Sequence, residues 1–236
     1  MSTIYHIVQF GDGSAYAMFD ACDWKCTYCV RNVSPWCTSL PEGTVKTLNK
    51  IKIKHLNINE LLEILKENAV KLVFLGGGEP TYDPELKTIM NRLKINGIGT
   101  WLITNGELLD DEIFLLSDGI TFSIKAIDEI THIRLTGKSN RDTLKNFEKY
   151  GKSEKIVAET VFYPGLVDCE EVQKIAKFVH DINPDTRFRI DRAVQLKSMN
   201  GFMECVNKIK LIHERTYYFE LNLDDQDYPK LLYPKF

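Results

Sequence analysis

No apolar stretch in this chain of 236 residues reaches 18 residues, so the sequence lacks a helix able to span a membrane. Its first segment, MSTIYHIVQFGDGS, also lacks the charged start and the apolar run of a secretory signal. We therefore expect a cytoplasmic protein. Because that compartment keeps thiols reduced, we expect the six cysteines to be metal ligands, catalytic groups or core residues and not to form disulfides.

A large excess of charge of either sign is missing as well. The formal net charge is −3 at pH 7, and the sequence pI is about 6.0. Without a basic surplus we do not expect binding to nucleic acid or to an anionic membrane. Hydrophobic residues make up 44% of the chain and charged residues 27%, which is typical of a globular protein with a substantial core.

Short apolar runs rich in β-branched and aromatic residues alternate along the chain with segments of helical periodicity. The expected strands cover residues 15–21, 70–80, 100–106, 119–126, 155–165 and 186–194, and the expected helices cover 58–69, 83–97, 110–117, 140–151 and 168–182. Six β/α units in a row predict an α/β fold with a parallel sheet, as an open sheet or as an incomplete (β/α)6 TIM-type barrel. We expect one domain over residues 1–236, with a core at about 15–194 and a helix and strand extension at 195–236.

Three cysteines gather in the segment CDWKCTYC, directly after the first expected strand. Cys22, Cys26 and Cys29 are separated by three and then two residues, so one tight loop can direct three thiolates to one centre. A cubane iron–sulfur cluster normally takes four cysteines, and a set of three leaves one iron open to a small molecule.

Cys37 lies close enough downstream to supply a fourth thiol, which keeps a second interpretation open. The four cysteines would then form a zinc site or a closed electron-transfer cluster, and in the zinc case the protein would be a non-enzymatic binding module. Zinc ribbons usually pair two separated C-x2-C knuckles, and this sequence has one. Cys169 and Cys205 are interpreted as ordinary residues of helices.

The cysteine spacing C-x3-C-x2-C, followed by GGGEP at the end of the next strand, resembles the signature of the radical S-adenosylmethionine (SAM) enzymes. The resemblance covers residues 15 to about 194. It implies a [4Fe-4S] cluster held by the three clustered cysteines, with the amino and carboxylate groups of SAM on the open iron. It also implies reductive cleavage of SAM to a 5′-deoxyadenosyl radical that abstracts a hydrogen atom from a substrate.

Candidate contacts for SAM follow the second and third strands. Gly77 and Gly78 let backbone carbonyls approach a ligand because no Cβ stands in the way, and Glu79 follows them. Thr104 and Asn105 offer a hydroxyl and an amide at the next strand end. Both segments are also compatible with plain tight turns.

Two further strands carry polar candidates. Ser123 and Lys125 share one side of the fourth strand, and a lysine on a buried strand needs an anion such as the SAM carboxylate. An exposed lysine at the barrel mouth is the alternative. Arg189 alternates with Arg187 and Asp191 on the sixth strand, where it is a candidate for the SAM sugar or a substrate carboxylate, or belongs to a solvated ion pair.

The segments SIKAIDEITHIRLTGKSN (123–140) and VFYPGLVD (161–168) resemble the glycyl-radical-enzyme activases, typified by the pyruvate formate-lyase activating enzyme. In that family the fourth strand carries Asp-Leu-Lys, so Lys125 matches the lysine that contacts the SAM carboxylate. Ser123 departs from the pattern by replacing the aspartate. The resemblance implies a glycyl radical enzyme as protein substrate and a flavodoxin or ferredoxin as reductant.

A small-molecule radical SAM enzyme, of the 7-carboxy-7-deazaguanine synthase type, or a peptide modifier fits the short chain and the glycine motif as well. The sequence has no second cysteine group of the kind that an auxiliary-cluster domain would need. The sequence alone does not identify the substrate.

Replacing Cys37 with alanine separates the three-cysteine from the four-cysteine interpretation. We expect the C37A protein, purified without oxygen, to keep the iron and sulfide content of the wild-type chain, because three thiolates suffice for an open cluster. Loss of the cluster in C37A, or one zinc per chain without iron, would contradict the open-site interpretation.

Overall fold

The computed structural model describes residues 2–196, 199, 201–219 and 228–236. Within them the strands form one sheet in the order β8-β7-β6-β5-β4-β3-β2-β1-β9. The strands are β1 Ile4–Gln9, β2 Ala15–Phe19, β3 Leu72–Gly77, β4 Gly99–Thr104, β5 Gly119–Ser123, β6 Ile156–Phe162, β7 Arg187–Arg192, β8 Thr216–Tyr217 and β9 Lys230–Tyr233.

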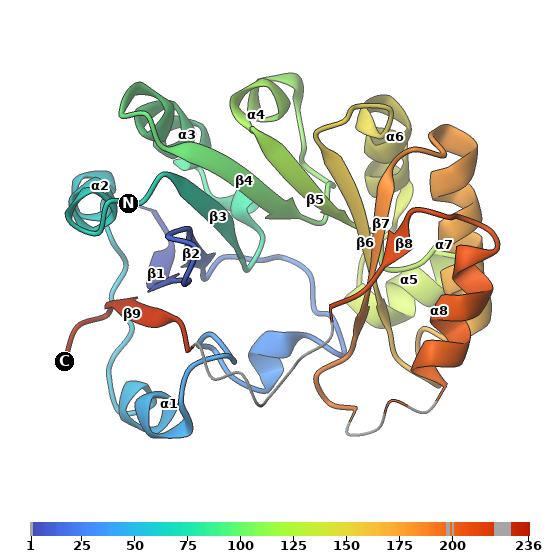
Figure 1. The fold of residues 1–236 in the computed structure, drawn as a ribbon, viewed down its shortest axis with the longest axis horizontal. Helices are drawn as coiled ribbons and strands as arrows, with labels where there is room; N and C mark the ends of the chain where they lie inside the picture. Colours follow the sequence, from blue (N-terminus) through green and yellow to red (C-terminus); the bar gives the residue numbers. More distant parts are fainter. Residues whose placement is uncertain (1, 197–198, 200, 220–227) are drawn as a thin grey trace.

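The strands from β2 to β8 are parallel, whereas β1 and β9 are added antiparallel at one end of the sheet. Among the described residues β8 and β9 are the two edges, and the curved sheet stays open between them (Figure 1). This confirms the predicted α/β fold class, an incomplete barrel with a mostly parallel sheet. The six expected strands correspond to β2–β7.

Helices follow the outer side of the curve, with α2, α3, α4 and α6 succeeding one another around it (Figure 1). The helices are α1 Glu42–Leu48, α2 Ile58–Glu67, α3 Leu86–Ile95, α4 Asp111–Leu116, α5 Glu129–Thr136, α6 Arg141–Tyr150, α7 Cys169–Ile182 and α8 Phe202–Lys210. In the described part of the chain no helix combines the length and apolarity needed to cross a membrane.

Three elements were absent from the sequence-based prediction: β1, α1 and α5. Five of the six residues of β1 are buried, among them His6, so the strand shows no alternation of polar and apolar residues. Helix α5 buries the polar residues His132 and Thr136 beside Leu135, so it lacks a clean apolar stripe. Strand β9, from the expected extension, pairs with β1. The single-domain boundary itself stays a prediction.

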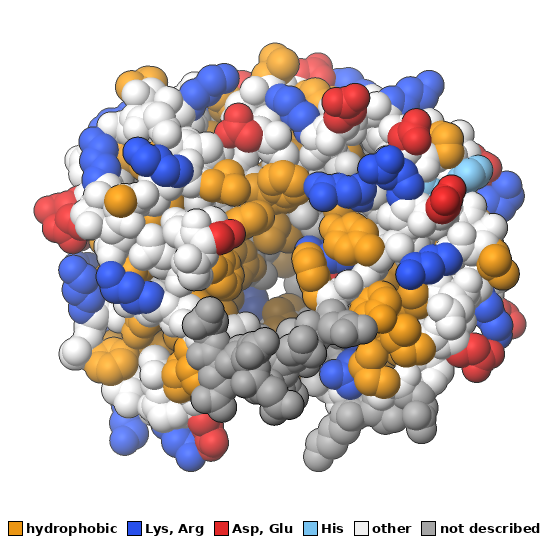
Figure 2. Space-filling view, viewed as in Figure 1, with side chains coloured by type: hydrophobic (Ala, Val, Ile, Leu, Met, Phe, Trp, Pro, Cys, Tyr) orange, Lys and Arg blue, Asp and Glu red, His pale blue; other side chains and the backbone are white. Residues whose placement is uncertain are grey.

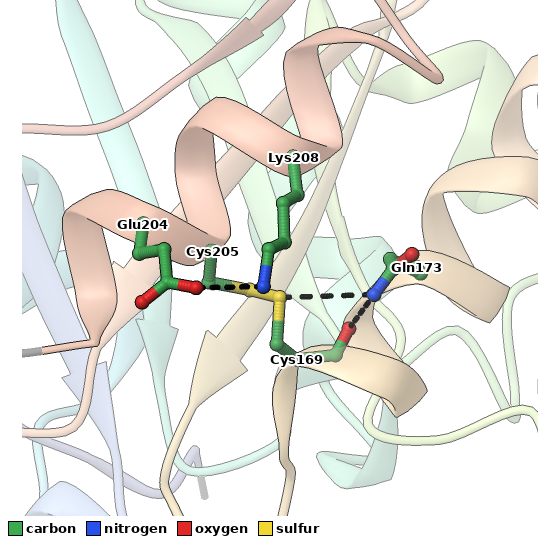
Figure 3. The surroundings of a disulfide bond; sticks show 5 residues. All are labelled: Cys169, Gln173, Glu204, Cys205 and Lys208. Carbon is green, nitrogen blue, oxygen red and sulfur yellow. Dashed lines mark hydrogen bonds and ion pairs between the residues drawn. A yellow bond between two sulfur atoms is a disulfide. The ribbon is translucent and has the colours of Figure 1, made fainter.

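A disulfide between Cys169 and Cys205 corrects the expectation that both are ordinary thiols (Figure 3). Cys169 begins α7 and Cys205 lies in α8, and the two helices bring their Cα atoms to 5.4 Å. That separation lies in the range that a disulfide requires. The sequence could not show the pairing because 36 residues separate the two cysteines, and the inferred compartment argued against it. The other four cysteines are free.

The disulfide predicts a defined thiol count and a defined loss of stability. Alkylation of the unfolded, unreduced chain should label four of the six cysteines, and mass spectrometry counts the labels. The C169S/C205S protein should lose roughly 3 to 4 kcal/mol of unfolding free energy, since the bond restricts a loop of this length in the unfolded state. Labelling of all six cysteines, with unfolding of the wild-type chain unaffected by reductant, would contradict the bond.

Candidate functional site

All eleven residues predicted for the site line one cavity of about 400 Å³ at the carboxyl ends of the parallel strands. They are Cys22, Cys26, Cys29, Gly77, Gly78, Glu79, Thr104, Asn105, Ser123, Lys125 and Arg189. Figure 2 shows a hollow near the centre of one face, bordered by apolar side chains. The structure therefore brings the predicted residues together, while their individual roles stay predictions.

The glycines at the end of β3 and directly after it allow this strand to pack against the segment that leads into the cysteines. Gly77 has a φ of +91°, a conformation that favours glycine. A Cβ on Gly78 would lie 2.3 Å from the carbonyl oxygen of Ala21. Backbone hydrogen bonds continue here beyond the strands, because Gly78 N–H donates to Phe19 O and Glu79 N–H donates to Ala21 O, both at 2.8 Å. These bonds fix the chain directly before Cys22.

Glu79 is a buried acceptor that joins the ends of β3 and β4. Its carboxylate accepts hydrogen bonds from the Thr104 hydroxyl at 2.7 Å, from the Asn105 N–H at 2.7 Å and from Thr81 N–H and hydroxyl at 3.0 and 2.6 Å. Burial raises the pKa of Glu79, and these donors oppose that effect. Through these hydrogen bonds Glu79 positions Thr104 and Asn105, the two residues predicted to contact the ligand.

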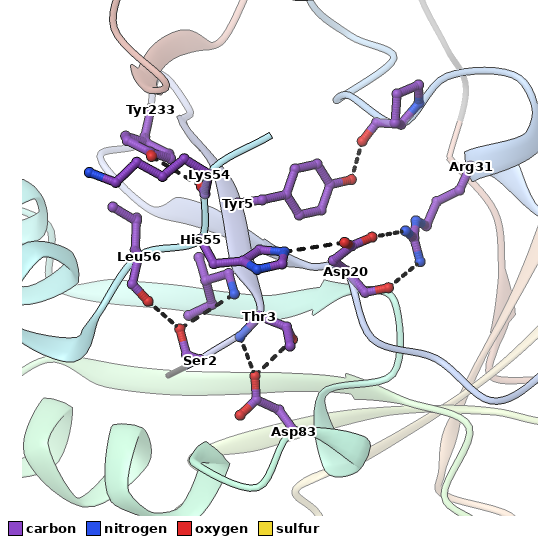
Figure 4. A network of polar contacts seen from close by, with 12 residues as sticks. Ser2, Thr3, Tyr5, Asp20, Arg31, Lys54, His55, Leu56, Asp83 and Tyr233 are labelled. Carbon is purple, nitrogen blue, oxygen red and sulfur yellow. Dashed lines mark hydrogen bonds and ion pairs between the residues drawn. The ribbon is translucent and has the colours of Figure 1, made fainter. Parts of the chain in front are cut away.

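The segment of residues 20–31, here called the cysteine loop, is fastened at its start by Asp20. Arg31 donates to the Asp20 carbonyl at 2.8 Å and pairs with its carboxylate at 2.5 Å. His55 contacts the other carboxylate oxygen at 3.2 Å (Figure 4). Because Asp20 precedes Cys22 and Arg31 follows Cys29, the ion pair closes the loop around the three cysteines.

The far side of the cysteine loop docks on the C-terminal end of α5. Lys25 N–H donates to Thr136 O at 2.8 Å, and Thr27 N–H donates to Leu135 O at 2.9 Å. The last carbonyls of a helix have no partner within the helix, and here the loop supplies their donors. The turn after α5 adds an ion pair between Lys138 and Asp23 at 2.7 Å.

Cys37 lies apart from the other three free cysteines. It packs in an apolar cluster with Tyr5, Met18 and Trp36, and it does not line the cavity. Among the described residues no group of three or more His, Cys, Asp or Glu side chains is arranged to hold a metal ion. This arrangement argues against the four-cysteine zinc site.

The donor set fits an iron–sulfur cluster better than a single ion. Each thiolate of a cubane binds a different iron, so the three sulfurs stand farther apart than the ligands of one ion. Cys22, Cys26 and Cys29 are free, they come from one loop, and they all border the cavity. A group larger than one ion would find three candidate protein ligands here, with open space beside them.

A ladder of polar side chains crosses neighbouring strands on the opposite wall. Ser123, Glu159 and Arg189 are register partners across β5, β6 and β7. Ser123 donates to Glu159, Lys125 donates to Ser123 Oγ at 2.5 Å, and the Lys125 ammonium lies 3.8 Å from Glu159 Oε2. Arg189 pairs with Asp191 at 3.0 Å. Lys125 is thus a largely covered cation, with its side chain 15% exposed and a protein counter-ion beside it, and not an exposed residue of the mouth.

The charges of this wall are tightly coupled. Burial opposes ionisation of Glu159, but Lys125 and Arg189 outweigh it and lower the pKa of that carboxyl. Burial, together with Glu159 nearby, raises the pKa of Asp191 to about 6. Glu159 was not predicted as a site residue, although a carboxylate inside the apolar strand sequence IVAETVF was the available signal.

Comparison with known proteins agrees with this geometry. The sequence profile of the Radical SAM superfamily matches residues 16–179. A protein of Methanocaldococcus jannaschii provisionally named a glycyl-radical enzyme activating enzyme is 33% identical over 177 residues, 72% of this chain and 63% of that protein. The pyruvate formate-lyase-activating enzyme of Staphylococcus epidermidis is 30% identical over 195 residues, 76% of this chain and 74% of that protein. The chain belongs to the radical SAM superfamily.

Solved structures share the fold. SuiB of Streptococcus suis bound to S-adenosylmethionine gives a TM-score of 0.61 at 18% identity, over 89% of this chain and 47% of SuiB. A domain of a pyruvate-formate lyase-activating enzyme from Bacteroides vulgatus gives 0.56 at 18% identity, over 63% of this chain and 98% of the domain. The chain thus spans about half of SuiB and under two thirds of the Methanocaldococcus protein.

Because Gly78 lies so close to Ala21, we expect a side chain at this position to destabilise the fold. G78A should lower the unfolding free energy by about 1 to 3 kcal/mol, because the new Cβ forces the chain before Cys22 away from β3. The matched control is G43A in α1, where nothing lies within 4 Å of the added Cβ, and there we expect no loss. Denaturant unfolding of the two variants measures the difference, and equal stability would contradict the close packing.

Proposed function

We propose that this chain binds a [4Fe-4S] cluster through Cys22, Cys26 and Cys29 and reductively cleaves SAM to start hydrogen abstraction. The observation that carries the proposal is that three free cysteines from one loop border the same cavity as the glycine segment and Lys125. Three thiolates leave one position of a cubane without a protein ligand. The cavity beside them offers space for a ligand at that position.

The cavity walls suit the different parts of SAM. Backbone carbonyls at Gly77 and Gly78 are acceptors for an ammonium, and Lys125 is a donor for a carboxylate. Thr104 and Asn105, held by Glu79, are polar groups on the wall between them, and Ser123 and Arg189 continue that wall across β5 and β7. The apolar residues Val161 and Ala193 complete the lining and exclude water.

Cys22, Cys26 and Cys29 would hold the cluster, which would supply the one electron needed to cleave SAM into methionine and a 5′-deoxyadenosyl radical. Hydrogen transfer from the substrate would convert that radical to 5′-deoxyadenosine. The electron comes from a flavodoxin or ferredoxin. The contribution of the chain is to hold the two groups side by side in a pocket where Glu79 and Glu159 already orient Thr104, Asn105 and Ser123. Trp24 and Tyr28, both buried in the cysteine loop, restrict access of solvent to the thiols.

We further propose that the substrate is a glycyl radical enzyme, from which the enzyme removes a hydrogen atom of a glycine. Two relatives at 33% and 30% identity that carry activating-enzyme names support this choice. The sheet is open between β8 and β9 in the described part of the chain, which suits access by an extended segment of a partner protein.

The direct test incubates the anaerobically reconstituted, reduced protein with SAM and measures 5′-deoxyadenosine by chromatography. We expect cleavage by the wild-type chain and a loss of at least about a hundredfold in C26A, because the cluster loses one of three ligands. C37A is the matched control and should cleave SAM at the wild-type rate. Cleavage in C26A equal to wild type, or none in the reconstituted wild-type chain, would refute the proposed chemistry.

Deuterium transfer identifies the substrate class. A glycyl radical enzyme that carries deuterated glycine should yield 5′-deoxyadenosine containing deuterium. Transfer from a small molecule or a short peptide instead would keep the radical chemistry and refute the activase assignment.

A further inference from the structure

Trp24 is buried although the loop around it is largely accessible to solvent. It is 7% exposed, whereas Lys25 directly after it and Cys22 two positions before it are exposed, and Asp23 is half-buried. The ring lines the cavity and contacts the His132 ring edge-on, with ring centroids 4.8 Å apart. A buried indole needs an acceptor for its N–H, and Trp24 Nε1 donates to Glu107 Oε2 at 2.6 Å. A carboxylate acceptor makes this one of the stronger hydrogen bonds of the loop.

Glu107 is itself firmly held at the turn after β4. Its N–H donates to Asn105 Oδ1 at 2.9 Å, and Asn146 of α6 donates to the carbonyls of Gly106 and Glu107 at 2.8 and 3.1 Å. Gly106 has a φ of +76° and packs against the Phe122 ring so closely that a Cβ there would overlap it. The turn therefore has little freedom, and the carboxylate of Glu107 starts from a fixed backbone.

We propose that Glu107 is a positioning residue that holds the cysteine loop against the turn after β4 through the indole of Trp24. The inference rests on the proposed function, because the loop carries the predicted iron ligands and the turn carries Thr104 and Asn105. The single Trp24–Glu107 bond joins these two parts on one side of the cavity. On the other side the loop is joined to β3 through Ala21 and to α5 through Lys25 and Thr27.

A second buried tryptophan, Trp36, provides a matched control for the Trp24–Glu107 hydrogen bond. Trp36 is also buried, at 3% exposed, and its Nε1 donates to Asn49 Oδ1 at 2.8 Å. Trp36 belongs to the apolar cluster that contains Cys37 and does not line the cavity. N49A therefore removes the same kind of bond without touching the cysteine loop.

The first experiment follows iron release from anaerobically reconstituted protein into a chelator, with E107A, E107Q, W24F and N49A beside the wild-type chain. We expect E107A and W24F to release iron about five- to tenfold faster than wild type, as the loss of one charge-assisted hydrogen bond implies. E107Q keeps an uncharged acceptor for the indole, so its rate of iron release should lie between those of wild type and E107A. The W24F/E107A double variant should release iron no faster than the faster single variant, because both changes remove one bond. N49A should match wild type.

The second experiment uses the cluster-free chain, so that its outcome does not depend on iron. Amide hydrogen exchange in peptides that cover residues 22–29 should speed up in E107A and W24F and stay unchanged in N49A. If the rates of iron release and of amide exchange in E107A equal those in N49A, the positioning role of Glu107 is overturned. The proposed function is unaffected by that result. A wild-type chain that takes up no iron would overturn the proposed function, and the exchange result would then decide whether Glu107 holds the loop.

Discussion

The functional site depends on the continuation of backbone pairing beyond the ends of β2 and β3. Parallel strands normally separate into loops at this edge of a sheet. Here Gly78 and Glu79 continue to bond to Phe19 and Ala21, and the absence of a side chain at Gly78 allows the two segments to approach. The cysteine loop therefore begins from a fixed point, and its thiols face the cavity that the other strand ends surround.

Further attachments hold that loop in place. Arg31 and Asp20 join its two ends, the C-terminal carbonyls of α5 accept hydrogen bonds from its middle, and Glu107 accepts a hydrogen bond from Trp24. Lys138 pairs with Asp23, and Gln195 donates to the Tyr28 carbonyl. The loop is therefore irregular in conformation yet constrained by several other segments. The polar ladder from Ser123 to Arg189 forms the facing wall, where two cations and two carboxylates balance each other. Net neutrality lets the wall bury its charges without leaving one uncompensated.

The sequence predicted the parallel part of the fold, and it selected residues that line one cavity, because both follow from local patterns. β-Branched runs and helical periodicity identified β2–β7, and the rule that ligands bind at the carboxyl ends of parallel strands placed Gly77, Asn105 and Lys125 together. Most of what it missed depends on contacts between distant residues. The disulfide of Cys169 and Cys205 and the use of α5 as a support for the cysteine loop have no local signature. The hairpin partner β1 did have one, since the turn segment GDGS lies between two apolar runs. Glu159 carried a visible signal, a carboxylate in an apolar strand, but its partners Lys125 and Ser123 became apparent only from the strand register.

The central claim is that three cysteines hold a cluster with one iron left for SAM. Mössbauer spectroscopy of the protein reconstituted with iron-57 tests it most directly, because the method distinguishes individual irons. Adding SAM should change the spectrum of one iron in four and leave the other three as they were. Four irons that all keep the same parameters with and without SAM, or iron that is replaced by a single zinc, would contradict it.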